Sequence, residues 1–94
     1  MTAAQLIVRC REKGRDLICA GQMLAVRDIM EALCWSVSEL AKRSGVSASM
    51  LFEMLRLDKF PTSDKLGRLA RAFGMKLYVL DAFAELELEA EITL

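Results

Sequence analysis

The side chains in this chain that are most able to do chemistry are the charged ones, and they are segregated along the sequence. Residues 1–34 carry five basic and four acidic side chains. Residues 35–76 carry eight basic and four acidic ones, whereas residues 77–94 carry five acidic ones and no basic one. The middle segment therefore suits contact with phosphate, which the acidic end would repel.

The groups that catalysis or metal binding needs do not occur in a usable pattern. The chain has no histidine, its 5 glycines are dispersed, and no nucleophile stands at a recognisable spacing from a base. The cysteines Cys10, Cys19 and Cys34 form no C-x-x-C pair, so we expect small buried apolar side chains instead of a zinc site or a disulfide framework. We predict that the protein is not an enzyme and uses no cofactor and no metal.

Length and composition predict one folded unit. The 94 residues are too few for two independent cores, and 54% are hydrophobic while 28% are charged. No apolar run reaches the roughly 18 residues that span a bilayer, and the first ten residues do not resemble a secretory signal. We expect a cytoplasmic protein with no membrane partner.

Helical periodicity predicts two N-terminal helices over residues 3–13 and 16–33, either separate or continuous. In the second helix Met23, Val26 and Met30 follow steps of three and four residues, as in a coiled-coil seam. Such a seam serves either burial in the chain's own core or contact with a second copy, and the sequence leaves both readings open.

Three further helices are delimited by caps. Ser36 and Glu39 fit a capping box, Gly45 ends the helix that they start, and Ser47 caps the next one. Thr62 or Ser63 starts a last helix that Gly74 ends. After Gly74, residues 76–80 are rich in strand formers, and residues 86–94 alternate apolar with polar side chains. We predict a mainly α fold of four to five helices with a C-terminal β-strand or short hairpin.

Helices over residues 36–45 and 47–55, joined by a turn containing glycine, predict a helix-turn-helix. Leu40 and Ala41 would pack on Val46 and Leu51 and hold the second helix outward, so that its first turn can enter a major groove. A generic helical bundle is the alternative interpretation.

The segment from Trp35 to Lys76 resembles the Cro/repressor-like (Xre) helix-turn-helix family. The matching features are the Ser36 cap, Leu40-Ala41, Gly45-Val46-Ser47, the Pro61-Thr62 loop and the run Leu69-Ala70-Arg71-Ala72-Phe73-Gly74. The segment after Gly74 looks like the C-terminal strand of Xre-type antitoxins, which pairs with its counterpart in a homodimer.

The resemblance implies that the start of the second helix faces a DNA groove, and that side chains around it contact phosphate. Val37 stands where the family often has glutamine, and Leu57 where it often has glycine. The groove-facing set lacks Arg, Lys, Asn and Gln, which make the bidentate base contacts, so direct readout of bases would be poor. The groove-facing residues would be Ala48, Ser49, Phe52 and Glu53, with Ser47 as a small residue that lets the helix start approach DNA, and the phosphate contacts would be Ser36, Ser38, Arg56, Lys59 and Thr62.

The sequence thus predicts a transcriptional regulator that binds double-stranded DNA as a homodimer. The alternative is an interaction module, an antitoxin or anti-activator, that keeps the fold and binds a toxin or a transcription activator. We expect residues 1–34 to serve packing and dimerisation, 35–75 to form the DNA-binding core, and 76–94 to form the strand and acidic tail. The residues expected to contact a second copy or a partner are Met23, Val26, Met30, Leu77 and Val79.

Overall fold

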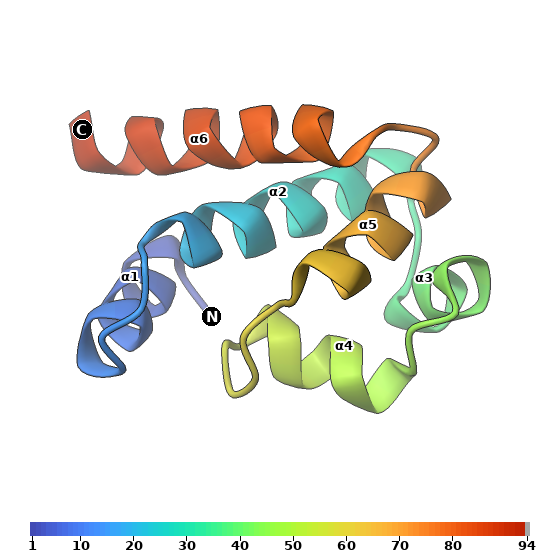
Figure 1. Ribbon diagram of the computed structural model, residues 1–94, viewed down its shortest axis with the longest axis horizontal. Helices are drawn as coiled ribbons and strands as arrows, with labels where there is room; N and C mark the ends of the chain where they lie inside the picture. Colours follow the sequence, from blue (N-terminus) through green and yellow to red (C-terminus); the bar gives the residue numbers. More distant parts are fainter. Residues whose placement is uncertain (94) are drawn as a thin grey trace.

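The computed structural model describes residues 1–93, which form six α-helices and no strand. Figure 1 shows the long helices α2 and α6 side by side, with α5 next to them and α4 on the far side of the molecule from α6. None of the helices in residues 1–93 is long and apolar enough to cross a membrane. The helices are α1 (Ala3–Glu12), α2 (Ile18–Leu33), α3 (Val37–Ser44), α4 (Ala48–Leu55), α5 (Ser63–Ala72) and α6 (Leu77–Thr93).

Side-chain caps explain where four of these helices begin. The hydroxyls of Ser36, Ser47 and Thr62 each accept a hydrogen bond from the backbone N–H three residues later, at 3.1, 3.2 and 3.3 Å. A complete capping box occurs only at α1 among these helices, between Thr2 and Gln5. At α3 the carboxylate of Glu39 instead accepts from Arg43 Nε at 2.6 Å. The caps predicted at α3 and α4 are therefore confirmed. The second hydrogen bond of a capping box at α3, from the backbone N–H of Ser36 to the side chain of Glu39, is not formed.

One apolar core joins all six helices, and α2 supplies more of it than any other. α4 adds Leu51 and Met54, and the loop after α4 adds Leu57. Burying a leucine or methionine side chain stabilises the fold by about 1.5–3 kcal/mol, so this core holds α4 firmly in place. The core residues of α2 are Cys19, Ala20, Met23, Leu24, Ala25, Val26 and Met30.

The C-terminal segment corrects the prediction of a β-strand or hairpin, because residues 77–93 form the single helix α6. Leu80 and Ala84 are fully buried and lie four residues apart, on the same face of a helix. Their burial against α2 outweighs the strand-like alternation of apolar and acidic residues over 86–94, and the exposed apolar members of that alternation, Leu86 and Ile92, are left in solvent.

Two non-glycine residues adopt the left-handed conformation at helix ends. Cys34 ends α2 with φ 57°, and Leu57 follows α4 with φ 56°. Leu57 is fully buried, so its side chain is anchored in the core despite the backbone cost. Cys10 and Cys19 are buried as expected, and burial raises the pKa of both thiols, but Cys34 is exposed.

Candidate nucleic-acid interface

α3 and α4 form the two crossed helices that the sequence predicts. Gly45 ends α3 with φ 75°, a left-handed conformation that glycine adopts at no steric cost, and Ser47 caps α4 two residues later. Leu40, Val46 and Leu51 are buried beneath this turn. The start of α4 is thereby fixed by the core while its outer face remains in solvent.

The outer face of α4 presents small and apolar side chains. Ser49 is exposed, Phe52 is 54% exposed, and Ala48 and Glu53 are half-buried. An exposed phenylalanine that the fold does not need can contact a thymine methyl group, and small side chains at the helix start allow close approach to DNA. Ser47, Ser36 and Ser38, at the starts of α4 and α3, are exposed too.

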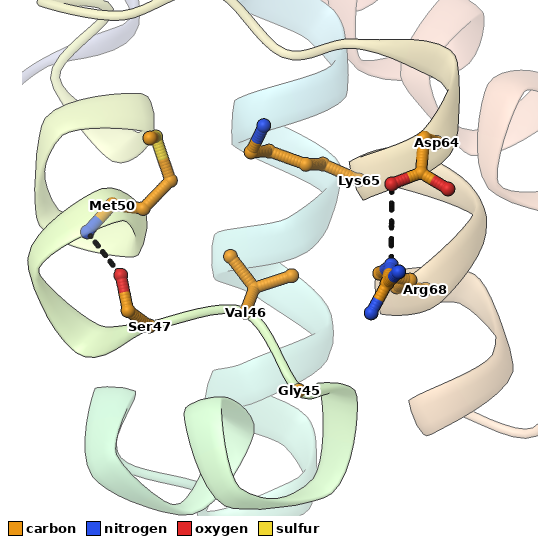
Figure 2. Close-up of a pocket in the computed structure, with 7 residues that line it drawn as sticks. All are labelled: Gly45, Val46, Ser47, Met50, Asp64, Lys65 and Arg68. Carbon is orange, nitrogen blue, oxygen red and sulfur yellow. Dashed lines mark hydrogen bonds and ion pairs between the residues drawn. The ribbon is translucent and has the colours of Figure 1, made fainter.

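A shallow groove runs between the start of α4 and the start of α5. Figure 2 shows Ser47 and Met50 on one side of it and Asp64, Lys65 and Arg68 on the other. Arg68 Nε binds Asp64 Oδ2 at 3.2 Å, whereas Lys65 makes no ion pair within residues 1–93. Of the three charged residues that line the groove, Lys65 is therefore the one whose charge is not neutralised by an ion pair in the described part of the chain.

The helix-turn-helix family model matches residues 26–80 of the chain, more than half its length. The chain belongs to the Cro/repressor-like (Xre) helix-turn-helix family. This is a family of DNA-binding domains. No curated protein and no solved structure is significantly similar to the chain. The match begins within α2 and ends within α6, so it includes α3, α4 and α5 entire.

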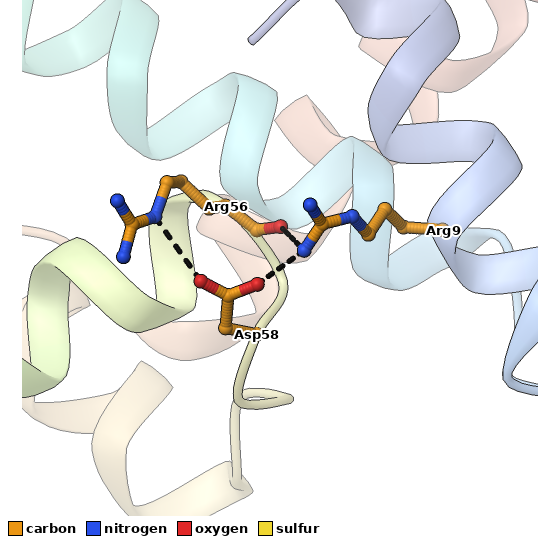
Figure 3. Close-up of polar contacts among 3 residues, drawn as sticks. All are labelled: Arg9, Arg56 and Asp58. Carbon is orange, nitrogen blue, oxygen red and sulfur yellow. Dashed lines mark hydrogen bonds and ion pairs between the residues drawn. The ribbon is translucent and has the colours of Figure 1, made fainter.

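The C-terminal end of α4 in this helix-turn-helix protein carries a cluster of charges. Asp58 lies between Arg56 and Arg9, as Figure 3 shows, and binds Arg56 Nε at 3.2 Å and Arg9 Nη1. Arg9 also donates to the backbone carbonyl of Arg56, which ties α1 to the end of α4. The hydrogen bond and charge of Arg9, with the charge of Arg56, lower the pKa of Asp58. Two guanidinium groups around one carboxylate leave this end of α4 net positive.

The remaining predicted phosphate contacts, Lys59 and Thr62, are exposed in the loop between α4 and α5. Thr62 already accepts the N–H of Lys65 as the cap of α5. Arg43, by contrast, is occupied on α3, because it pairs with Glu39 and its guanidinium lies 4.4 Å from the centre of the Trp35 ring. The basic groups around α4 are thus Lys59 and Lys65, which make no ion pair within residues 1–93, and Arg56, which shares the carboxylate of Asp58 with Arg9.

Sequence reasoning did not identify Lys65 or Arg9 as parts of this region. Lys65 lies at the start of α5, which reaches α4 only through the tertiary fold, and Arg9 is 49 residues from Asp58. Near Lys65, the only local pattern was the spacing of Asp64 and Arg68, four residues apart on one helix, which predicts an ion pair between those two side chains.

The residues expected at a contact with a second copy fall into two groups. Met23, Val26 and Met30 lie in the protein's own core, with 1%, 0% and 7% of their surface exposed, so no partner reaches them in this conformation. Leu77 and Val79 begin α6 and are half-buried. The sequence left open whether the apolar seam of α2 serves the chain's own core or contact with a second copy. In this structure the seam is buried in the core.

Proposed function

We propose that the protein is a sequence-specific transcriptional regulator that binds double-stranded DNA as a homodimer, with α4 in the major groove. The observation that carries the proposal is the outward face of α4, where Ser49 and Phe52 are exposed on a helix that the core fixes beneath. Arg56 and Lys59 follow the end of α4, and Lys65 lines the groove beside its start, so all three can supply the charge that phosphate contacts require.

Two α4 helices would enter successive major grooves about 34 Å apart on a near-palindromic site. Because α4 lacks the side chains that make bidentate base contacts, the shape and deformability of the DNA would supply much of the specificity. Leu77 and Val79 are candidates for the contact between the two copies, since both retain some exposed surface.

The test is a selection from a library of random duplexes, followed by fluorescence anisotropy with the enriched sequence over a series of salt concentrations. We expect an enriched inverted repeat and an affinity that falls steeply with salt. Phe52→Ala is expected to weaken the sequence preference, while Leu86→Ala, an exposed apolar control on α6, leaves it intact. Failure to enrich any sequence and to retain any duplex at low salt would contradict the proposal.

A protein partner bound to α4 is the second candidate, as in an antitoxin or anti-activator. The exposed apolar ring of Phe52 and the lack of base-reading side chains favour it. Met54 and Leu57 are fully buried, however, so the apolar surface on this side reduces chiefly to Phe52. Loss of a partner on Phe52→Ala, with DNA binding retained, would favour this second function.

A further inference from the structure

The side of the molecule away from α4 holds a second groove, between α2 and α6. It has a volume of about 230 Å³ and is lined by Ala25, Ile29, Ala32 and Phe83, with the carboxylates of Asp28 and Glu87. Figure 1 places α2 and α6 together on the side opposite α4, so DNA bound at α4 would leave this groove open.

Apolar surface continues from the groove along α6. Phe83 is 44% exposed and Leu86 is 62% exposed. The two residues are three positions apart on α6, so their side chains are neighbours on the surface of that helix. Large apolar side chains gathered on one face of a small protein mark an interaction surface more often than chance exposure.

The charge around the groove is strongly one-sided. α6 carries five carboxylates and no basic residue, and the second half of α2 adds Asp28 and Glu31. The nearest cation, Arg27, donates from Nη1 to the backbone carbonyl of Met1. Asp28 of α2 and Glu87 of α6 both line the groove, and two carboxyl groups that share one site cost energy when both are ionised.

We propose that this α2–α6 groove binds a basic amphipathic segment of a partner protein, with apolar side chains over Phe83 and a Lys or Arg between Asp28 and Glu87. Complementary charge selects this occupant, because a cation between the two carboxylates relieves their repulsion. A second copy that placed residues 81–91 of its own α6 in this groove would instead bring five more carboxylates to the same surface, whereas the dimer contact proposed above involves only the start of α6.

The carboxyl pair also makes binding depend on pH. Hydrogen bonding to Asp28, burial, and the charges of Asp28 and Glu91 raise the pKa of Glu87 to about 7, and the charge of Arg27 opposes them. A bound cation favours the ionised pair, so the affinity for a basic segment should rise as the pH passes through 7. A purely apolar contact would show no such dependence.

The probe is a synthetic 14-residue amphipathic helix of leucine and lysine, compared with a leucine and glutamate helix of the same pattern, each labelled and titrated with the full chain. We expect the basic peptide alone to bind, more tightly at pH 8 than at pH 6. The double variant Asp28→Asn/Glu87→Gln should weaken binding by about tenfold and remove the pH dependence. The matched control Glu85→Gln/Glu89→Gln removes the same charge from exposed positions of α6 and should change the affinity less than about twofold.

Three outcomes would overturn the proposal: no binding of the basic peptide, equal weakening by both double variants, or a groove occupied by a second copy. The last is recognised by light scattering, if Phe83→Ser lowers the molar mass of the protein while Val8→Ser, at an exposed position of α1, does not. Thermal unfolding of each variant shows that the fold is retained, and unchanged DNA binding by Asp28→Asn/Glu87→Gln separates this groove from the site at α4.

Discussion

Gly21 of α2 lies directly against the backbone of Ala84 in α6. A Cβ atom built on Gly21 would overlap the carbonyl oxygen of Ala84 and would come within 3.2 Å of the Cβ of Leu88. The close approach of the two helices at this point therefore requires a residue with no side chain in α2. This contact is one of many between α2 and α6.

Gly21→Ala is expected to destabilise the protein by about 1–3 kcal/mol, because α6 must move away from α2 to admit the methyl group. Gly67→Ala is the matched control, since Gly67 lies inside α5 with open space around the site of its missing Cβ. That change should stabilise the protein by roughly 0.5–1 kcal/mol through helix propensity. Urea unfolding of both variants measures the two effects, and the same sign for both would contradict the interpretation of the contact.

The contrast between Gly21 and the C-terminal alternation shows why part of the fold could not be predicted from the sequence. The caps at Ser36, Ser47 and Thr62 are local, so they could be predicted and are confirmed. The choice between strand and helix for residues 77–93 depends on what lies opposite Leu80 and Ala84. That neighbour is α2, about sixty residues earlier in the chain, and no local pattern identifies it.

The candidate interface likewise contains residues that could be predicted from the sequence and residues that could not. The positions on α4 follow from the family pattern, and the structure places Ser49 and Phe52 in solvent as that pattern requires. Met23 and Val26 are equally apolar whether they face a partner or a core, so periodicity alone could not decide between the two. Lys65 and Arg9 reach α4 only through packing of α5 and α1.

Cys34→Gly is expected to stabilise the fold. Cys34 is exposed and ends α2 in the left-handed conformation, where a Cβ atom costs about 1 kcal/mol and glycine avoids the cost. Cys34→Ala keeps the Cβ and should leave the free energy of unfolding within about 0.5 kcal/mol of the parent. Equal stability of the glycine and alanine variants would show that the conformation of residue 34 carries no strain.

Leu57→Gly is expected to destabilise the fold, although Leu57 has nearly the same φ angle as Cys34. Glycine would relieve the backbone strain, but the buried leucine side chain would be lost from the core. Removing a buried leucine side chain costs about 2–5 kcal/mol, which outweighs the relief. We expect a clear fall in the urea midpoint, in contrast to Cys34→Gly, and an unchanged or higher midpoint would contradict the burial seen here.

Asp58→Asn is expected to lower the stability slightly and to strengthen DNA binding. The carboxylate of Asp58 binds Arg9 and Arg56, and its removal frees both guanidinium groups and adds one unit of positive charge at the end of α4. We expect DNA affinity to rise about threefold to tenfold at low salt.

The pKa of Asp58 lies below its ordinary value of 3.8, so its contribution to stability is present at neutral pH and is lost as the pH falls below about 4. The stability of Asp58→Asn should therefore fall less between pH 7 and pH 3 than that of the parent protein, which thermal unfolding over this pH range would measure.

Arg56→Ala and Lys65→Ala are expected to weaken DNA binding nearly equally for all sequences. If each side chain contacts one phosphate, each variant should reduce the slope of log affinity against log salt by about 1. Lys76→Ala is the control, because Lys76 is exposed in the loop between α5 and α6, and Figure 1 shows that loop on the side of the molecule away from α4. Anisotropy titrations with specific and random duplexes measure the slopes, and an effect of Lys76→Ala as large as the others would contradict the assigned interface.

Glu87→Gln is expected to alter how stability depends on pH. The raised pKa of Glu87, about 7 against an ordinary 4.5, means that the folded chain binds more protons than the unfolded chain between these two values. Stability should therefore fall as the pH rises from about 4.5 through 7, because the ionised pair with Asp28 repels itself. Glu87→Gln should flatten this interval and be the more stable protein at pH 8, whereas Glu89→Gln, at an exposed position of the same helix, should follow the parent. If parent and Glu87→Gln proteins showed parallel unfolding curves from pH 5 to 8, the two carboxyl groups would not be coupled across α2 and α6.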